Sequence, residues 1–171
     1  MKKIRYTESL QPGDVMLVEG GKYNPLARII QYATKSRYSH AAMYIGKDEY
    51  GLDFVLEASW GGVQVSSIDK YVHRNWVALR HKDMTPEKAD EMLDWLLFKI
   101  DKGYDYFGLV GIGVALLGKK KNPWDDKSRY WCSELVADAY KVGGLELLVE
   151  DDTWKVSPGD LERQKVFRVV Y

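Results

Sequence analysis

The sequence predicts an α+β protein in which a small antiparallel sheet or half-barrel packs against a helix that begins at the single cysteine. Two observations lead to this class. From residue 39 to residue 80 the chain consists of short strand-like segments separated by brief turns, which is typical of an antiparallel sheet. Amphipathic helical segments then follow, and the last of them begins at Cys132. A run of strands followed by helices is the pattern of the α+β class.

Length and composition narrow the possible partners. The chain has 171 residues, which fits one domain, and we expect residues 1–171 to form it. Its 25 Lys and Arg balance 25 Asp and Glu, so no overall charge favours a nucleic-acid partner. One cysteine and three scattered histidines lack the spacing of metal ligands, and we expect neither a metal nor another cofactor. The composition does not indicate an oligomeric state.

The first half of the chain is rich in strand signals. Five segments have the composition and the bounding turns of strands: 13–19, 39–46, 52–58, 63–65 and 76–80. A short amphipathic helix is expected at 25–33, where a proline occupies the first helical position. Strands 39–45 and 53–58 should form a hairpin beside the cysteine helix.

The second half supplies helices and a final strand. Thr85 and Pro86 are the N-cap and first residue of a helix whose apolar stripe extends to Ile100. Phe107–Leu117 is almost wholly apolar but too short to cross a bilayer. We expect it to be buried or to line a cleft, and peripheral membrane contact is the alternative. A turn at Pro158-Gly159 and a strand at 166–170 complete the chain.

Cys132 lies where a helix should begin. Apolar residues follow it at the i+3, i+4 and i+7 positions, Gly143-Gly144 ends the helix, and Asp126 and Ser128 are candidate N-caps. The free N–H groups and the dipole of a first helical turn favour an anion, and a thiolate is such an anion. A buried structural cysteine is the alternative, because free cysteine packs as a small hydrophobe.

His40 and Glu57 are candidates for a base and for the group that holds it. A hairpin that is symmetric about its turn pairs Ile45 with Leu52 and His40 with Glu57, and paired residues point to the same side. Gln64, on the next strand, is the alternative third residue. A thiolate, a base and an orienting group together are the set that covalent amide hydrolysis needs.

Two short stretches of the sequence resemble the motifs of a known family. Ser-His-Ala-Ala-Met-Tyr-Ile-Gly at 39–46, followed by Val-Leu-Glu-Ala-Ser at 55–59, resembles the histidine motif of NlpC-like papain-fold hydrolases. Tyr-Trp-Cys-Ser-Glu-Leu-Val at 130–136 is similar to the cysteine motif of the same family. Here the histidine motif comes first, which is the order of the circularly permuted, YiiX/YaeF-like amidases. The resemblance implies a permuted papain-like fold.

The resemblance also implies roles for single residues. Cys132 would be the nucleophile, His40 the base and Glu57 the orienting acid of a cysteine amidase or peptidase. Tyr104 would assist at the oxyanion site, with Tyr106 as the alternative. The implied substrate is a small peptide, a peptidoglycan fragment or an N-acylated amino acid. Two other functions fit the same fold: a lipid-acting acyltransferase or hydrolase similar to lecithin:retinol acyltransferase relatives, and a catalytically idle binding module.

The N-terminal residues bear on where the protein acts. They lack the apolar segment of a signal peptide, and no run of about 18 apolar residues follows anywhere in the chain. We therefore expect a cytoplasmic protein without a transmembrane segment. Action on a cell wall would then need another route, such as phage-driven lysis.

Overall fold

The computed structural model describes residues 7–21, 23–100, 102–104, 129–147 and 153–171. The sequence also made predictions for Tyr106, Phe107–Leu117, Asp126 and Ser128, which lie outside these residues. The prediction that Asp126 or Ser128 caps the cysteine helix is wrong, because the N-cap of that helix is Trp131. Among the helices of the described part, none is long and apolar enough to span a membrane.

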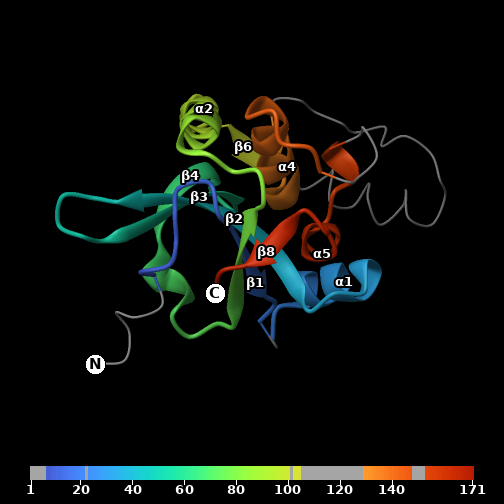
Figure 1. Cartoon of the computed structure of the whole chain (residues 1–171). Helices are drawn as coiled ribbons and strands as arrows, with labels where there is room; N and C mark the ends of the chain where they lie inside the picture. Colours follow the sequence, from blue (N-terminus) through green and yellow to red (C-terminus); the bar gives the residue numbers. More distant parts are fainter. Residues whose placement is uncertain (1–6, 22, 101, 105–128, 148–152) are drawn as a thin grey trace.

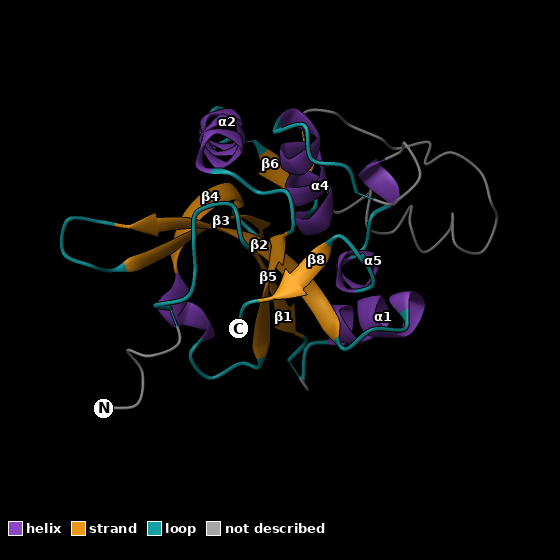
Figure 2. Cartoon of the chain, viewed as in Figure 1, coloured by secondary structure: helices purple, strands orange, loops and turns teal. Residues whose placement is uncertain are grey.

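An antiparallel sheet of six strands forms the centre of the structure (Figures 1 and 2). In spatial order the strands are β4 (Gly62–Ser67), β3 (Asp53–Ser59), β2 (Tyr38–Lys47), β1 (Val15–Glu19), β5 (Trp76–His81) and β8 (Phe167–Val169). Each corresponds to a strand expected from the sequence, so the strand predictions are confirmed. β1, β2, β3 and β4 follow one another in the chain through short turns or one helix, which places β2 between β1 and β3. β5 then pairs with the free side of β1.

Helices cover one face of this sheet. They are α1 (Pro25–Thr34), α2 (Pro86–Leu97), α4 (Cys132–Val142) and α5 (Pro158–Glu162). The short 3-10 turn η2 (Thr153–Lys155) contacts α4, whereas the turn η1 (Ile68–Tyr71) packs on the opposite face. Figure 1 shows α2 and α4 together above the sheet, and α1 beside α5. The cysteine helix therefore begins where the sequence predicted, and the fold class is confirmed.

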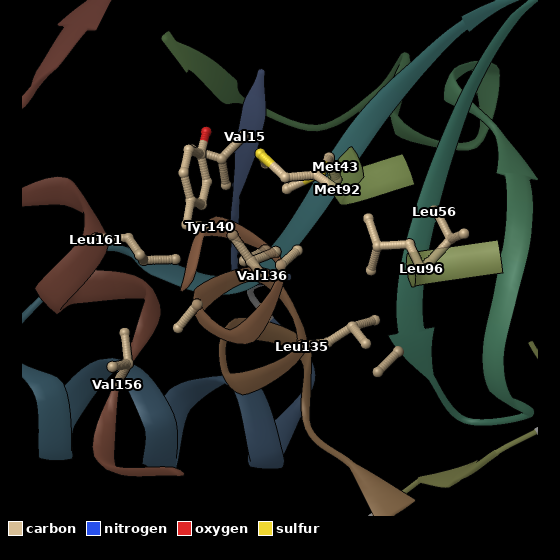
Figure 3. Close-up of a cluster of buried hydrophobic side chains, with 14 of the residues drawn as sticks. Val15, Met43, Leu56, Met92, Leu96, Leu135, Val136, Tyr140, Val156 and Leu161 are labelled. Atoms are coloured by element: carbon tan, nitrogen blue, oxygen red, sulfur yellow. The ribbon is translucent and has the colours of Figure 1, made fainter. Parts of the chain in front are cut away.

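The larger apolar cluster lies between the sheet and these helices. It joins Met43 of β2 and Leu56 of β3 to Leu135 and Val136 of α4 (Figure 3). Leu135 and Tyr140 are fully buried, which accounts for the apolar stripe that follows Cys132. Burial of one such side chain stabilises the fold by about 1.5–3 kcal/mol. The packing of this stripe fixes α4 against the hairpin of β2 and β3.

A second apolar cluster covers the opposite face. Ala42 and Tyr44 of β2 and Val55 of β3 meet Ile68 and Tyr71 of η1 there. The two clusters alternate along each strand, as the two faces of a pleated sheet require. Glu57 follows Val55 by two residues, so its side chain starts from the same face as η1.

The hairpin of β2 and β3 forms as predicted, but its register differs from the symmetric one. Symmetry would pair Leu56 with Ala41, whereas its observed partner is Met43. Next to the turn the shift is three residues, because Lys47 pairs with Asp53, and a bulge at Ile45 reduces it to two. Two is an even number, so the side chains on the His40 side of the bulge keep the predicted face. Continued by one residue, the observed register sets Glu57 opposite Ala42, diagonal to His40.

A second bulge lies next to His40. Val18 of β1 pairs with His40, but the next residue, Glu19, pairs with Tyr38, so Ser39 is an extra residue in β2. In a regular strand Tyr38 and His40 would point to the same face, but Tyr38 packs in the larger cluster. Bulges change side-chain direction and are frequent beside active sites. This one separates the direction of Tyr38 from that of His40, which keeps the register of Ala41, Ala42 and Met43.

Two short parallel strands lead into α4. β6 (Gly103–Tyr104) pairs with β7 (Arg129–Tyr130), and the backbone of Tyr104 lies next to that of Tyr130. The Val63 N–H donates to the carbonyl of Lys102 at 2.8 Å, which joins this pair to β4. The N-terminus of α4 is thus held from the sheet side as well as by its apolar stripe.

The turn predicted at Pro158-Gly159 is wrong, because these residues begin helix α5. Ser157 is its N-cap, and its hydroxyl accepts from the N–H of Asp160 at 3.1 Å. The carboxylate of Asp160 accepts in return from the N–H of Ser157 at 3.0 Å. A capping box with proline at the first position is a helix signal, and it outweighs the turn preference of Pro-Gly.

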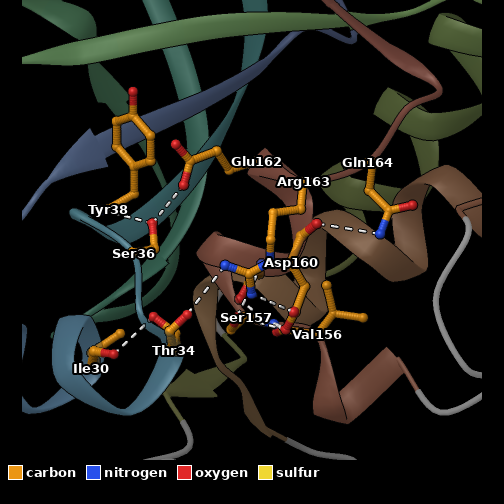
Figure 4. Close-up of polar contacts among 11 residues, drawn as sticks. Ile30, Thr34, Ser36, Tyr38, Val156, Ser157, Asp160, Glu162, Arg163 and Gln164 are labelled. Carbon is orange, nitrogen blue, oxygen red and sulfur yellow. Dashed lines mark hydrogen bonds and ion pairs between the residues drawn. The ribbon is translucent and has the colours of Figure 1, made fainter.

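Helix α5 holds the loop that precedes β2 (Figure 4). The Ser36 hydroxyl donates to Glu162 Oε2 at 2.8 Å and accepts from the N–H of Tyr38 at 3.1 Å. Arg163 Nη1 donates to the carbonyl of Thr34 at 3.2 Å. These contacts fix the chain four residues before His40.

Gly159 allows α5 to approach this loop, and its replacement is a test of the contact. A Cβ at that position would lie 2.7 Å from Ser36 Cβ and 3.1 Å from the carbonyl oxygen of Thr34. Although alanine is the better helix former, we expect Gly159→Ala to lower the free energy of unfolding by about 1–3 kcal/mol. Denaturant unfolding of the variant and of Lys165→Ala, an exposed control in the same segment, measures this. A more stable Gly159→Ala protein would contradict the packing described.

Candidate active site

The structure brings together three side chains that the sequence singled out. Cys132 is the first residue of α4, His40 lies in β2 and Glu57 in β3. His40 hydrogen-bonds through Nε2 to Glu57 Oε2 at 2.5 Å. The same side chain interacts with that of Cys132, and each shifts the pKa of the other. The imidazole therefore lies between thiol and carboxylate.

The surroundings of Cys132 favour its thiolate. Burial raises the pKa of a thiol, and the side chain is only 2% exposed. The hydrogen bond and charge of His40 oppose this, and backbone hydrogen bonds at Ala41 and Ser133 add to them, so the pKa of Cys132 lies below its usual value. The position at the start of α4 acts in the same direction, because free N–H groups stabilise an anion there.

His40 is held as an imidazolium. Burial would lower its pKa, but the hydrogen bonds and charges of Cys132 and Glu57 outweigh it and raise the pKa of His40 to about 9. The His40 side chain is 20% exposed, so it is more accessible to solvent than the buried Cys132 thiol. Its ring also lies 6.0 Å from that of Tyr71 on the sheet face opposite α4.

Glu57 is fully buried and has three donors. Besides His40, the Lys70 ammonium donates to Oε1 and the Tyr71 hydroxyl donates to Oε2. Burial alone would raise the pKa of this carboxyl, but the hydrogen bonds from His40, Lys70 and Tyr71 lower it well below the usual range. Glu57 is therefore a carboxylate throughout the ordinary pH range.

Gln64, the alternative to Glu57, lies directly opposite it on β4 but bonds elsewhere. Its amide donates to the Ser59 hydroxyl at 2.8 Å. The other histidines are also apart from this site. His81 is buried between the Glu146 carbonyl and the Asp83 N–H, and His73 is exposed.

Tyr104 is placed by its backbone only. Its pairing with Tyr130 sets it beside the residue two positions before Cys132, and its side chain lies outside the described residues. Trp131 directly precedes Cys132. Its indole N–H is buried and has no hydrogen-bond partner in the described part of the chain.

Lys70 and Tyr71 were not found from the sequence. They lie on η1, whose N-cap Ser67 accepts from the N–H of Asp69 at 3.2 Å. Ser67 followed by the apolar pair Ile68 and Tyr71 is a weak signal of a short capped turn. Nothing in it indicates that the turn faces Glu57.

Comparisons with known proteins show the family to which the chain belongs. The sequence matches the profile of a family described as "Permuted papain-like amidase enzyme, YaeF/YiiX, C92 family" over residues 9–153. A protein of Escherichia coli strain K12 named "Probable lipoprotein peptidase YaeF" is 26% identical over 184 positions, covering 92% of this chain and 64% of that protein. The chain thus spans less than two-thirds of the length of this curated relative.

A solved structure shares the fold. The crystal structure of "metalloprotein yiiX" from Escherichia coli O157:H7 superposes with a TM-score of 0.70 at 19% identity, covering 95% of this chain and 97% of that one. That protein is described as a metalloprotein. In the described residues of this chain, no three His, Cys, Asp or Glu side chains are grouped so that they could hold a metal ion.

The pairing of Cys132 with His40 predicts an unusual dependence of thiol reactivity on pH. The thiolate should react with iodoacetamide at pH 6, where a free cysteine of pKa near 8.5 is mostly protonated. His40 keeps its proton until the pH rises through about 9, so reactivity should be nearly level between these values. His40→Ala removes the cationic partner and should slow alkylation at pH 6 by on the order of 10²-fold.

His73→Ala is the matched control, because it removes an exposed histidine away from the sulfur. Its alkylation rate should equal that of the wild type, as measured by mass spectrometry of timed samples. A structural cysteine predicts the reverse pattern. Alkylation would then be slow and insensitive to His40, and Cys132→Ser would clearly lower thermal stability.

Proposed function

This chain belongs to the YaeF/YiiX family of permuted papain-like amidases, and from this membership and the geometry of the site we propose that it is a cysteine amidase or peptidase. The proposal gives Cys132 the role of nucleophile, His40 that of general base and acid, and Glu57 that of orienting acid. One observation carries it: a single imidazole is hydrogen-bonded to a buried carboxylate and interacts with a cysteine at a helix N-terminus.

The first half of the proposed reaction forms an acyl-enzyme. The Cys132 thiolate attacks the carbonyl carbon of the amide, and the C–S bond forms as the carbonyl oxygen becomes an oxyanion. The His40 imidazolium then gives its proton to the leaving nitrogen, the C–N bond breaks and the amine departs. A thioester on Cys132 and a neutral imidazole remain.

The second half hydrolyses the thioester. Neutral His40 takes a proton from a water molecule, whose oxygen attacks the thioester carbonyl, and the C–S bond breaks to give the carboxylic acid and the thiolate. Glu57 stays ionised throughout and stabilises the imidazolium at each stage. Its role is to orient the ring rather than to accept a proton.

The oxyanion needs hydrogen-bond donors beside the nucleophile. The backbone N–H of Cys132, in the first turn of α4, is the first proposed donor. Tyr104 is the proposed side-chain donor, since its backbone runs beside the residues that precede α4. The buried indole N–H of Trp131 is a second candidate because it has no hydrogen-bond partner within the described residues.

We propose that the substrate is a peptide or peptide-like amide, such as a cell-wall peptide or an N-acylated amino acid. The family description supports an amide, and the name of the relative YaeF, a probable lipoprotein peptidase, supports a peptide. A cytoplasmic place of action stays a prediction. A lipid-acting acyltransferase and an idle binding module remain as outcomes of the test below.

Identification of the acyl group on Cys132 tests the proposed function. The protein is mixed separately with peptidoglycan fragments, N-acyl amino acids and phospholipid vesicles, quenched in acid, digested and analysed by mass spectrometry. We expect a thioester-linked peptidyl or N-acyl group on the peptide that contains Cys132, and none in Cys132→Ala. A fatty acyl group would instead support the lipid-acting function. No adduct and no hydrolysis in any arm would leave only the binding module.

The role of Glu57 is tested by a change of one atom. Glu57→Gln keeps the shape of the side chain but removes the charge that stabilises the His40 imidazolium. We expect the turnover of an amide substrate identified above to fall by roughly ten- to a hundredfold while the fold is retained. Gln64→Ala, on the facing strand, is the control and should leave turnover unchanged. If the two variants behaved in the opposite way, Gln64 would be the orienting residue.

A further inference from the structure

We propose that Lys70 and Tyr71 are positioning residues that hold the Glu57 carboxylate in the one orientation in which it can bond to His40. This inference rests on the proposed function, since it concerns the same thiol and imidazole. Both residues lie on η1, on the sheet face opposite α4. No contact described above joins either of them to Cys132.

The two oxygens of Glu57 have different partners. The Lys70 ammonium donates to Oε1, whereas His40 and the Tyr71 hydroxyl share Oε2. Rotation of the carboxylate about its last bond would break the bonds to Lys70 and His40 together. The three donors approach from β2 and from η1, so they fix the carboxylate plane as well as its position.

A glutamate needs such fixing more than a shorter side chain would. It has three side-chain torsions, and each free torsion carries conformational entropy that a single hydrogen bond must overcome. With only His40 as a partner, the carboxylate could meet the imidazole in several ways. Donors from Lys70 and Tyr71 remove this freedom before the imidazolium forms.

Tyr71 is suited to a purely positional role. Burial and the charge of Glu57 raise its pKa far above the usual value, so its hydroxyl keeps the proton that it donates. Its ring packs against the smaller apolar cluster and lies 6.0 Å from the His40 ring, which orients that ring as well. Removal of the hydroxyl would leave these ring contacts in place.

Lys70 has a second tether. Its ammonium also donates to the Ser66 hydroxyl at 3.1 Å and lies 5.1 Å from the centre of the Tyr71 ring. Its side chain is 38% exposed, so it joins the fully buried carboxylate to solvent. The site then alternates in charge from thiolate to imidazolium to carboxylate to ammonium, with no net charge.

The same hairpin carries a matched control at its other end. There Asp53 of β3 accepts from the Tyr44 hydroxyl at 2.6 Å and pairs with the Lys47 ammonium at 3.6 Å. A tyrosine and a lysine thus hold an acid at both ends of β3, but only Glu57 touches His40. Identical substitutions at the two ends separate an effect on the site from an effect on the hairpin.

The experiment measures the rate of Cys132 alkylation by iodoacetamide from pH 5 to 10 in the full chain. The variants are Tyr71→Phe, Lys70→Met and Lys70→Arg, with Tyr44→Phe and Lys47→Met as controls. We expect Tyr71→Phe and Lys70→Met each to slow alkylation at pH 6 by about three- to tenfold, as the imidazolium and hence the thiolate lose stability. Lys70→Arg should restore most of the rate, and both controls should match the wild type.

Thermal unfolding of each variant is measured together with its alkylation rate, so that a variant that has lost its fold is recognised. Should Lys70→Met fail to fold, Tyr71→Phe and Lys70→Arg still decide the outcome. Unchanged or faster alkylation in a folded Tyr71→Phe protein would overturn the inference, as would equal slowing in Tyr44→Phe. These outcomes differ from a failure of the proposed function, in which wild-type Cys132 itself would be unreactive at pH 6.

Discussion

The burial of one charge, that of Glu57, is the constraint on which the rest of the site depends. A carboxylate without solvent is tolerated only where donors replace the water that it has lost. Here the donors come from β2 and from η1, so the hairpin and the turn after β4 must both be formed. Once they are, the carboxylate can hold an imidazolium, and the imidazolium can hold a thiolate at the start of α4.

Much of this arrangement could be predicted because its signals are local. The alternation of apolar residues in β2 and β3, the turn between them and the apolar stripe after Cys132 are each contained in a few consecutive residues. The register was predicted with an error of two residues, yet His40 and Glu57 still meet. Side chains repeat every second residue along a strand, so an even error preserves the face.

What could not be predicted depends on contacts between distant segments. The bulge at Ser39 is invisible in a sequence read for alternation, yet it turns Tyr38 into the larger cluster while His40 keeps the register of the strand. The donors Lys70 and Tyr71 read as an ordinary short turn. Only Ser157-Pro158 and Asp160 carried a local signal that was misread, because a proline followed by a glycine also suggests a turn.

The contact between Ser36 and Glu162 has a consequence for the order in which the protein folds. These residues are 126 positions apart in the sequence, whereas successive strands from β2 to β4 meet through short turns. Contacts between distant residues carry a larger entropy of loop closure and tend to form late. The sheet can therefore form while the loop before His40 is still free. The loop before His40 would then be among the last parts of the chain to be fixed, and with it the histidine that favours the Cys132 thiolate.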